Sequence, residues 1–266
     1  MNAKEVLVAL SELTGGNWDE ILDKIHGRYP LKPEEVQKIM EGVPTPYLTL
    51  MDANEGLYPE DFIHSRRPPF VLYYQGNVDL LADLSKCVAI VGSREASPYG
   101  LSMAKKIAEG LAKRGYTIVS GLAKGVDAAA LEAAVPYGRA IAVLGNGLGM
   151  YYPATNKDLQ KRIASQGLLL SEYPYNIHPE AKNFPNRNRI IAYLSQMVVV
   201  AEAKPHSGTL ITAAFAAEAG RDVGAVPYHA DEDSACNRLI QDGAAMILSA
   251  DDVIFQLRGS NSFVRK

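Results

Sequence analysis

The chain has 266 residues, 47% of them hydrophobic, and carries a formal net charge of -3 at pH 7. A chain of this length can bury one large core and a small second one, so we expect one or two domains. The near balance of 27 basic and 30 acidic residues excludes nucleic-acid binding over the whole surface and allows only a local basic patch.

The first 45 residues predict a small helical domain. Two amphipathic stretches, at 4–13 and 33–40, have helical spacing and flank the single tryptophan, Trp18. A Pro-Thr-Pro turn ends this unit near residue 45. Residues 46–83 then predict a connector packed on the main domain, because their prolines bias the backbone away from helix.

Residues 46–266 predict one α/β domain. Short apolar runs alternate with helix-length amphipathic stretches, and their nearly continuous apolar character is typical of parallel strands covered on both faces. We therefore predict an extended Rossmann-like fold with a doubly wound, mainly parallel sheet. Strands are expected at 87–91, 116–119, 140–144, 168–170, 197–200, 223–226 and 246–248. Helices are expected at 99–114, 126–135, 156–166, 186–194, 209–219 and 237–242.

The loops that follow the strands are the candidate sites, because open parallel sheets bind ligands at the carboxyl ends of their strands. After the first expected strand, Gly92, Ser93 and Arg94 offer a phosphate close backbone approach, a hydroxyl and a bidentate cation. The alternative is a tight turn with an exposed arginine. After the second, Lys124 is either a phosphate ligand or a solvated cation, and we expect Asp127 to orient a loop.

A second candidate loop follows the fifth expected strand. Ser207, Gly208 and Thr209 open a helix, whose free N–H groups and dipole favour an anion. Ser207 as an ordinary N-cap is compatible with that role. Glu202, at the end of the strand, is expected to hydrogen-bond a neighbouring loop.

The segment 182–191 combines cations, amides and an aromatic ring in a few residues. Cations neutralise phosphates and an aromatic face stacks on a base, so the mixture is typical of single-stranded nucleic-acid binding. A plain helix start with solvated arginines is the alternative. The predicted contacts of this segment are Lys182, Phe184, Pro185, Arg187, Asn188 and Arg189.

No metal, cofactor or membrane is expected. The two cysteines and the five histidines lack ligand spacing, and a free buried Cys87 fits a reducing cytosol. No stretch approaches 18 uninterrupted apolar residues, and residues 1–12 lack the features of a secretory signal. We therefore expect a cytoplasmic protein.

Six motifs, in this order, resemble those of the DprA/Smf family. The resemblance covers about residues 57–248 and rests on 91–94 with 99–100, 120–123, 145–153, 171–172, 184–191, and 202–203 with 207–208 and 211–213. It implies a Rossmann-fold protein that binds and protects single-stranded DNA and loads the recombinase RecA onto it during natural transformation. It also implies a homodimer, paired through the later part of the Rossmann domain, without catalytic turnover.

The family's DNA-contacting motifs fall on residues already singled out. Its Gly-Ser/Thr-x-Arg loop corresponds to Gly92, Ser93 and Arg94, and its Phe-Pro-x-Arg-Asn-Arg segment to residues 184–189, with Lys182 as a neighbouring cation. The chain ends at Lys266, so we expect the form without a C-terminal winged-helix domain.

Four places depart from the family pattern. Leu131 stands in place of a histidine, Gly149 in place of an aspartate and Tyr228 in place of a glycine, and residues 233–235 replace a Ser-x-Gly turn. Roles at these positions, and on the dimer surface, are therefore not carried over.

Two enzyme classes are rivals to this interpretation. Rossmann-like folds include phosphoribohydrolases that cleave nucleotides, but the turn at 207–209 lacks their Gly-Gly-x-Gly-Thr-x-x-Glu arrangement. An NAD-linked oxidoreductase has only weak support, because the glycines at 145–149 follow the third strand and no acidic residue ends the second. We expect a binding protein and no enzyme.

Overall fold

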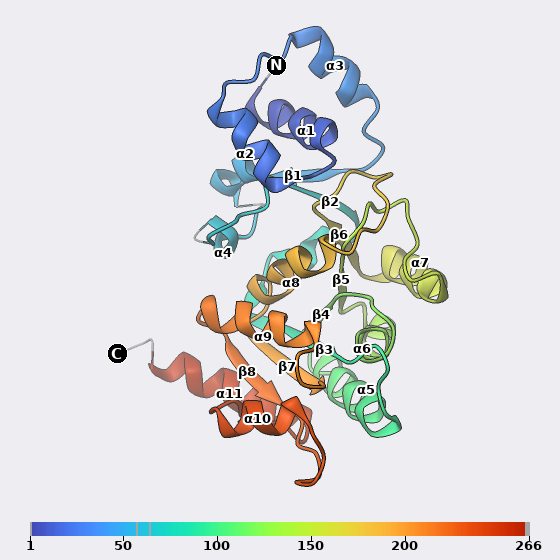
Figure 1. The fold of residues 1–266 in the computed structure, drawn as a ribbon, viewed down its shortest axis with the longest axis vertical. Helices are drawn as coiled ribbons and strands as arrows, with labels where there is room; N and C mark the ends of the chain where they lie inside the picture. Colours follow the sequence, from blue (N-terminus) through green and yellow to red (C-terminus); the bar gives the residue numbers. More distant parts are fainter. Residues whose placement is uncertain (1, 57, 64, 264–266) are drawn as a thin grey trace.

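The computed structural model describes residues 2–56, 58–63 and 65–263, so the outer limits of the predicted domains, Met1 and Lys266, lie outside the described residues. Its centre is a nine-stranded sheet in the order β1-β2-β6-β5-β4-β3-β7-β8-β9 (Figure 1). The strands are β1 (Tyr47–Thr49), β2 (Val71–Gly76), β3 (Cys87–Gly92), β4 (Thr117–Ser120), β5 (Ala140–Leu144), β6 (Leu168–Ser171), β7 (Met197–Glu202), β8 (Asp222–Ala225) and β9 (Ala245–Met246).

The strands β3 to β9 are those predicted from the sequence, and they pair in parallel as expected. The predicted helices are also present. The helices are α1 (Ala3–Thr14), α2 (Trp18–His26), α3 (Pro33–Glu41), α4 (Glu60–Ile63), α5 (Pro98–Ala112), α6 (Val126–Ala134), α7 (Lys157–Gln166), α8 (Asn183–Tyr193), α9 (Gly208–Glu218), α10 (Ala235–Gln241) and α11 (Ala250–Phe263). The doubly wound Rossmann-like fold is therefore confirmed, and α2, α4 and α11 are additions to it.

The predicted connector contributes two strands to the sheet. The strand β2 pairs antiparallel with β6, with Tyr73 opposite Ser171, and β1 pairs antiparallel with β2. Both strands lie at one end of the sheet, where an antiparallel extension is common. The sequence predicted an extended backbone here but not its pairing.

The N-terminal helices dock on the loop that follows β6 and on the segment before β2. The indole Nε1 of Trp18 donates a hydrogen bond to the carbonyl of Pro68 at 2.7 Å. Gly16 has a φ of +76°, and a Cβ there would lie 2.8 Å from the carbonyl oxygen of Glu172. The predicted boundary near residue 45 falls between α3 and β1.

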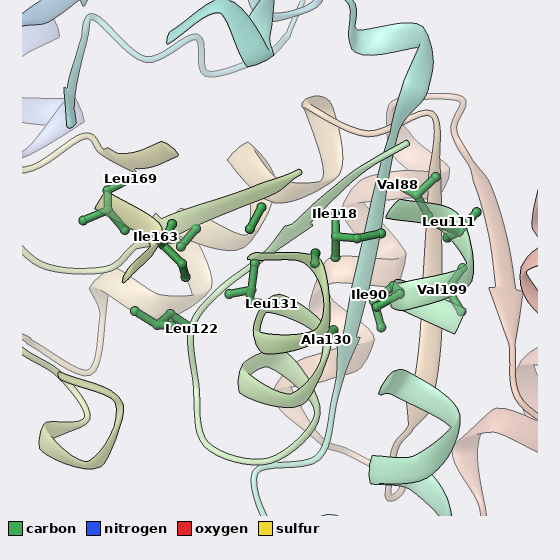
Figure 2. Packing of buried hydrophobic residues seen from close by; sticks show 14 of the residues in the cluster. Val88, Ile90, Leu111, Ile118, Leu122, Ala130, Leu131, Ile163, Leu169 and Val199 are labelled. Carbon is green, nitrogen blue, oxygen red and sulfur yellow. The ribbon is translucent and has the colours of Figure 1, made fainter. Parts of the chain in front are cut away.

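Alternate residues of each central strand face two separate cores. Val88 and Ile90 of β3 pack with Leu111 of α5 and Leu131 of α6, as Figure 2 shows. Cys87, Ala89 and Val91 point to the other face, which α8, α9 and α10 cover. Both faces of the sheet are thus buried, which explains why the strands are apolar throughout.

Cys87 and Cys236 are free and buried, as expected for Cys87. Within the described ranges, no helix is long and apolar enough to cross a membrane. Leu131, one of the divergent positions, is a fully buried core residue, so a leucine there serves packing.

The order of the strands reverses at β3. From β3 the chain builds outward through β4, β5 and β6, then returns to place β7 on the other side of β3. The loops after β3 and β7 therefore diverge to opposite faces of the sheet and leave a crevice between them. This crevice is where the fold itself provides a ligand site.

Candidate nucleic-acid interface

A cleft of about 620 Å³ lies at this reversal point, outside the carboxyl ends of β3 and β7. Its walls come from the loop after β3, the loop after β7 with the start of α9, and the first turns of α8. The predicted contact residues that line it are Gly92, Ser93, Arg94, Phe184, Pro185, Arg187, Asn188, Ser207, Gly208 and Thr209. Lys124, Lys182 and Arg189 were predicted for the same site but are not part of its lining.

The loop after β3 is fixed by its backbone. The N–H of Ser93 donates to the carbonyl of Glu202 at 2.8 Å, and the Ser93 carbonyl accepts from the N–H of Val126 at 3.2 Å. A Cβ on Gly92 would lie 2.6 Å from the side chain of Val126, so only glycine fits there. The fixed backbone leaves the exposed side chain of Arg94 at the rim of the cleft.

An aromatic pair forms one wall. The ring of Phe184 lies 5.3 Å from that of Tyr152, and the guanidinium carbon of Arg94 lies 5.6 Å from the centre of the Phe184 ring. Phe184 is half-buried, and a Cβ on Gly145 would lie 2.7 Å from its Cδ1. The glycine after β5 therefore makes the space that Phe184 occupies. The cation of Arg94 and the ring of Phe184 thus lie together, and nucleotide-binding proteins use this combination.

Arg187 lies at the base of the cleft, where only 4% of it is exposed. Its Nη1 donates to the carbonyl of Gly121 at 2.6 Å and to the carbonyl of Val143. Among the described residues its Nε has no hydrogen-bond partner. The sequence predicted a solvent-facing phosphate contact, whereas the structure makes Arg187 a buried brace between two strand ends with one donor left over.

Asp127 balances this buried charge. Burial raises the pKa of its carboxyl group, which the nearby Arg187 and backbone N–H donors oppose. Burial likewise lowers the pKa of Arg187 to about 10, against the pull of Asp127. The carboxylate accepts a hydrogen bond from the N–H of Gly121 at 3.1 Å, so Asp127 orients the loop after β4 as expected.

Arg189 and Lys182 point away from the cleft. Arg189 is buried and forms an ion pair with Glu172 at 2.6 Å, and its Nε donates to the carbonyl of Arg67 at 3.1 Å. Lys182 is exposed and pairs with Glu180 at 2.9 Å. Both line a second cavity, of about 250 Å³, between α8 and the N-terminal helices. Arg189 therefore ties α8 to other parts of the fold.

Lys124 is exposed in the turn before α6, next to a lining residue but outside the lining itself. The start of α9 forms the wall opposite α8. Ser207 occupies the N-cap position of α9, yet its side chain makes no capping hydrogen bond and its Oγ is buried without a partner among the described residues. A buried hydroxyl without a partner is uncommon.

Glu202 acts on a loop, as predicted. Its carboxylate accepts from the N–H and Oγ of Ser97, at 3.0 and 2.6 Å, and from the hydroxyl of Tyr228 at 3.0 Å. Tyr228 also packs edge-on against Tyr99, with ring centres 5.1 Å apart. The divergent Tyr228 thus holds the start of α5 in place.

The lining also includes residues outside the predicted site, three of which bear on its chemistry. Lys204 is an exposed cation after β7, Glu95 follows Arg94, and Tyr152 contacts Phe184. The sequence could have indicated Lys204, because it is the first cation after the end of β7. Within the described part of the chain, no group of histidine, cysteine or acidic side chains is arranged to hold a metal ion.

Comparison with known proteins gives a consistent match. A family model described as DNA recombination-mediator protein A matches residues 49–258. Protein Smf of Synechocystis sp. is 42% identical over 256 residues, which cover 94% of this chain and 63% of that protein. The DNA processing protein DprA of Streptococcus pneumoniae is 46% identical over 200 residues, 74% of this chain and 70% of that protein. The chain thus spans slightly less than two thirds of the Synechocystis relative.

Two solved structures have the same fold. The X-ray structure of DNA processing protein A from Streptococcus pneumoniae matches with a TM-score of 0.75 and 37% identity, covering 94% of this chain and 92% of that one. The structure from Helicobacter pylori matches with a TM-score of 0.72 and 33% identity, covering 82% and 98%. It is described as giving insights into the single-stranded DNA binding mode of that protein.

Proposed function

Because the chain belongs to the DNA recombination-mediator protein A family, we propose that it binds single-stranded DNA in the cleft at the ends of β3 and β7. The observation that carries this proposal is the pairing of an exposed cation with aromatic rings on one wall, Arg94 beside Phe184 and Tyr152. Phosphates and bases are recognised by these two kinds of group without regard to sequence.

The work is divided between exposed and buried groups. Arg94 and Lys204 are exposed at the cleft and neutralise phosphates. Arg187 contributes its unpaired Nε from below, and the opening of α9 supplies backbone N–H groups and the Ser207 hydroxyl. Phe184 stacks on a base.

The salt dependence of binding tests this division. Each phosphate contact contributes about -0.7 to the slope of log affinity against log salt for a single strand. With Lys182 and Arg189 turned away from the cleft, two or three contacts remain, so we expect a slope of about -1.4 to -2.1 for a short oligonucleotide. Fluorescence anisotropy titrations at several salt concentrations measure it, and a slope near zero would contradict phosphate binding.

A direct comparison of single-stranded and duplex DNA of the same sequence tests the function itself. We expect the single strand to bind more tightly in a gel-shift assay, because unpaired bases are free to stack on Phe184. Preference for the duplex would overturn the proposal. Release of free base from AMP would instead favour the rival enzyme class, and we propose that binding proceeds without such turnover.

We further propose that the protein acts in the cytoplasm as a homodimer that protects incoming single-stranded DNA and loads the RecA recombinase onto it in natural transformation. Support comes from the family description as a recombination mediator and from the resemblance of the motifs. The expected readout is faster RecA-dependent strand exchange on DNA coated with a single-strand-binding protein. The exposed apolar side chains of Met246, Leu248 and Phe255 support a self-association surface near the C-terminal end of the sheet.

A further inference from the structure

A second aromatic and basic group lies on the surface beside the cleft. Tyr151 is 40% exposed, and two lysines of α7 flank its ring: Lys157 Nζ lies 4.8 Å from the ring centre and Lys161 Nζ lies 5.9 Å away. The two lysines are four residues apart and therefore share one face of the helix. We call Tyr151, Lys157 and Lys161 the outer site.

The outer site is continuous with the cleft. Tyr152, the next residue after Tyr151, is 41% exposed and lies 5.3 Å from Phe184. Phe184 and Tyr152 are in ring contact, and Tyr151 is joined to Tyr152 through the backbone. A strand that stacks on Phe184 meets further aromatic surface as it leaves the cleft on this side.

The lysines of the outer site are free to bind an anion. In the described part of the chain, neither Lys157 nor Lys161 forms an ion pair, whereas Arg162 on the same helix pairs with Glu132. Asp158 lies on the side of α7 that carries Arg162, four residues away from it, rather than on the face of the two lysines. Two lysines without an ion pair beside a tyrosine ring combine phosphate and base contacts, as single-strand binding requires.

A cavity of about 250 Å³ adjoins the outer site. Tyr151, Tyr175 and Lys161 line it together with the amide side chain of Gln75. A Cβ on Gly149 would lie 2.5 Å from Cε1 of Tyr175, so this glycine is what allows the second ring its position. Two rings, a cation and an amide are the groups that hold a nucleobase.

We propose that a bound single strand leaves the cleft over the Tyr151–Tyr152 turn and continues along α7, where Tyr151 stacks on a base and Lys157 and Lys161 hold phosphates. The outer site thereby lengthens the binding track beyond the cleft. This inference rests on the proposed function of the cleft.

Oligonucleotide length separates the two sites. Oligothymidylates of about 4 to about 16 nucleotides cover the range of site sizes seen in single-strand binders. For the wild type we expect DNA affinity to keep rising with oligonucleotide length after the cleft is filled, because the longer strands also reach the outer site. The double variant Lys157→Ala/Lys161→Ala should lose this additional gain, and its salt slope on the longest oligomer should be less steep by about 1.4, for two lost phosphate contacts. Tyr151→Ala should weaken the longest oligomer by at least about fivefold, the lower end for loss of one stacked base.

The matched control is Lys105→Ala/Lys106→Ala, which removes the same charge from exposed positions of α5. It should leave the slope on the longest oligomer steeper than that of the α7 variant. An unchanged slope and affinity in the α7 variant would overturn the proposal, as would an equal loss on the shortest oligomer, which would place the lysines in the cleft. If the wild type binds neither length, the proposed function fails and this inference fails with it. Melting curves establish that each variant is folded.

Discussion

Arg94, Arg187 and Arg189 occupy three different environments although all three belong to motifs with one expected task. Arg94 is exposed and stands beside Phe184, whereas Arg187 braces two strand ends and Arg189 is paired with Glu172. An arginine in water exchanges partners at little cost, but a buried one leaves its partners unsatisfied when it is removed. Replacement by alanine should therefore weaken DNA binding at the exposed position and lower the stability of the fold at the buried ones.

We expect Arg94→Ala to weaken binding of all single-stranded sequences similarly and to leave the melting temperature nearly unchanged, because the side chain is exposed and forms no ion pair in the described residues. Arg187→Ala should instead lower the free energy of unfolding by about 3–5 kcal/mol, since it leaves the buried Asp127 and two carbonyls without their partner. Urea unfolding and anisotropy on both variants check this. An Arg187→Ala variant as stable as the wild type would contradict the role of Arg187 in holding the two strand ends together.

We expect Phe184→Leu to separate stacking from packing. Leucine keeps apolar contact with Tyr152 and fits beside Gly145, but it has no aromatic face for a base. Binding of a short oligonucleotide should weaken by about 1–3 kcal/mol. Phe184→Tyr is the control and should bind as the wild type does. Equal affinity of the leucine variant in anisotropy titrations would remove Phe184 from the list of contacts.

The elements of the cleft differ in how far the sequence determines them. Gly92 and the loop after it, like the polar opening of α9, follow apolar runs that clearly predict strands, so their meeting at the sheet edge could be predicted from the parallel topology alone. The direction in which each side chain of α8 points could not be predicted from that topology. That helix begins at Asn183, three residues before the predicted start, which places Phe184 and Pro185 in its first turn.

The buried guanidinium of Arg187 donates to the carbonyls of Gly121 and Val143, which lie 66 and 44 positions away along the chain. No local sequence pattern encodes such contacts. The pairing of β1 and β2 is likewise a long-range property of two short segments. By contrast, α2 had a local signal that the sequence prediction passed over: Asn17 caps it by accepting from the N–H of Glu20, and both residue types are typical of a helix start.

The glycine after β5 offers a test of how one element shapes another. We expect Gly145→Ala to displace the ring of Phe184, because the new Cβ would lie 2.7 Å from its Cδ1, and to cost about 1–3 kcal/mol of stability. Gly259→Ala in α11 is the control, since among the described residues no atom outside its own stretch of helix lies within 4 Å of a Cβ there. Combining Gly145→Ala with Phe184→Leu should give losses in DNA affinity that are not additive, because both act on one ring. If the losses were additive, the two substitutions would act on DNA binding independently, and Gly145 would not position the Phe184 ring.

At the scale of the whole molecule, the cleft is lined by α8, α9 and the loops after β3 and β7, whereas the edge of the sheet nearest the C-terminus is formed by β9, with α11 following it in the chain. Three apolar side chains are exposed here: Met246 of β9, Leu248 in the segment that follows it, and Phe255 of α11, which is 74% exposed. Among the described residues β9 is the last strand of the sheet, and exposed apolar side chains on an edge strand and on the segments after it are typical of a surface covered by another chain. We expect a second copy of this chain to cover it.

We expect Phe255→Glu to convert the proposed dimer into a monomer, because a carboxylate in the proposed apolar interface would lose its hydration on association. Light scattering coupled to size-exclusion chromatography measures the mass directly. Leu13→Glu on α1 is the matched control, since Leu13 is 50% exposed at the other end of the chain, and it should leave the mass unchanged. The monomeric variant should bind a short oligonucleotide as the wild type does, but a long one more weakly, because two linked clefts raise the effective concentration of the second. An unchanged mass for Phe255→Glu would place the dimer interface elsewhere. A weaker short-oligonucleotide affinity would show that the cleft depends on association.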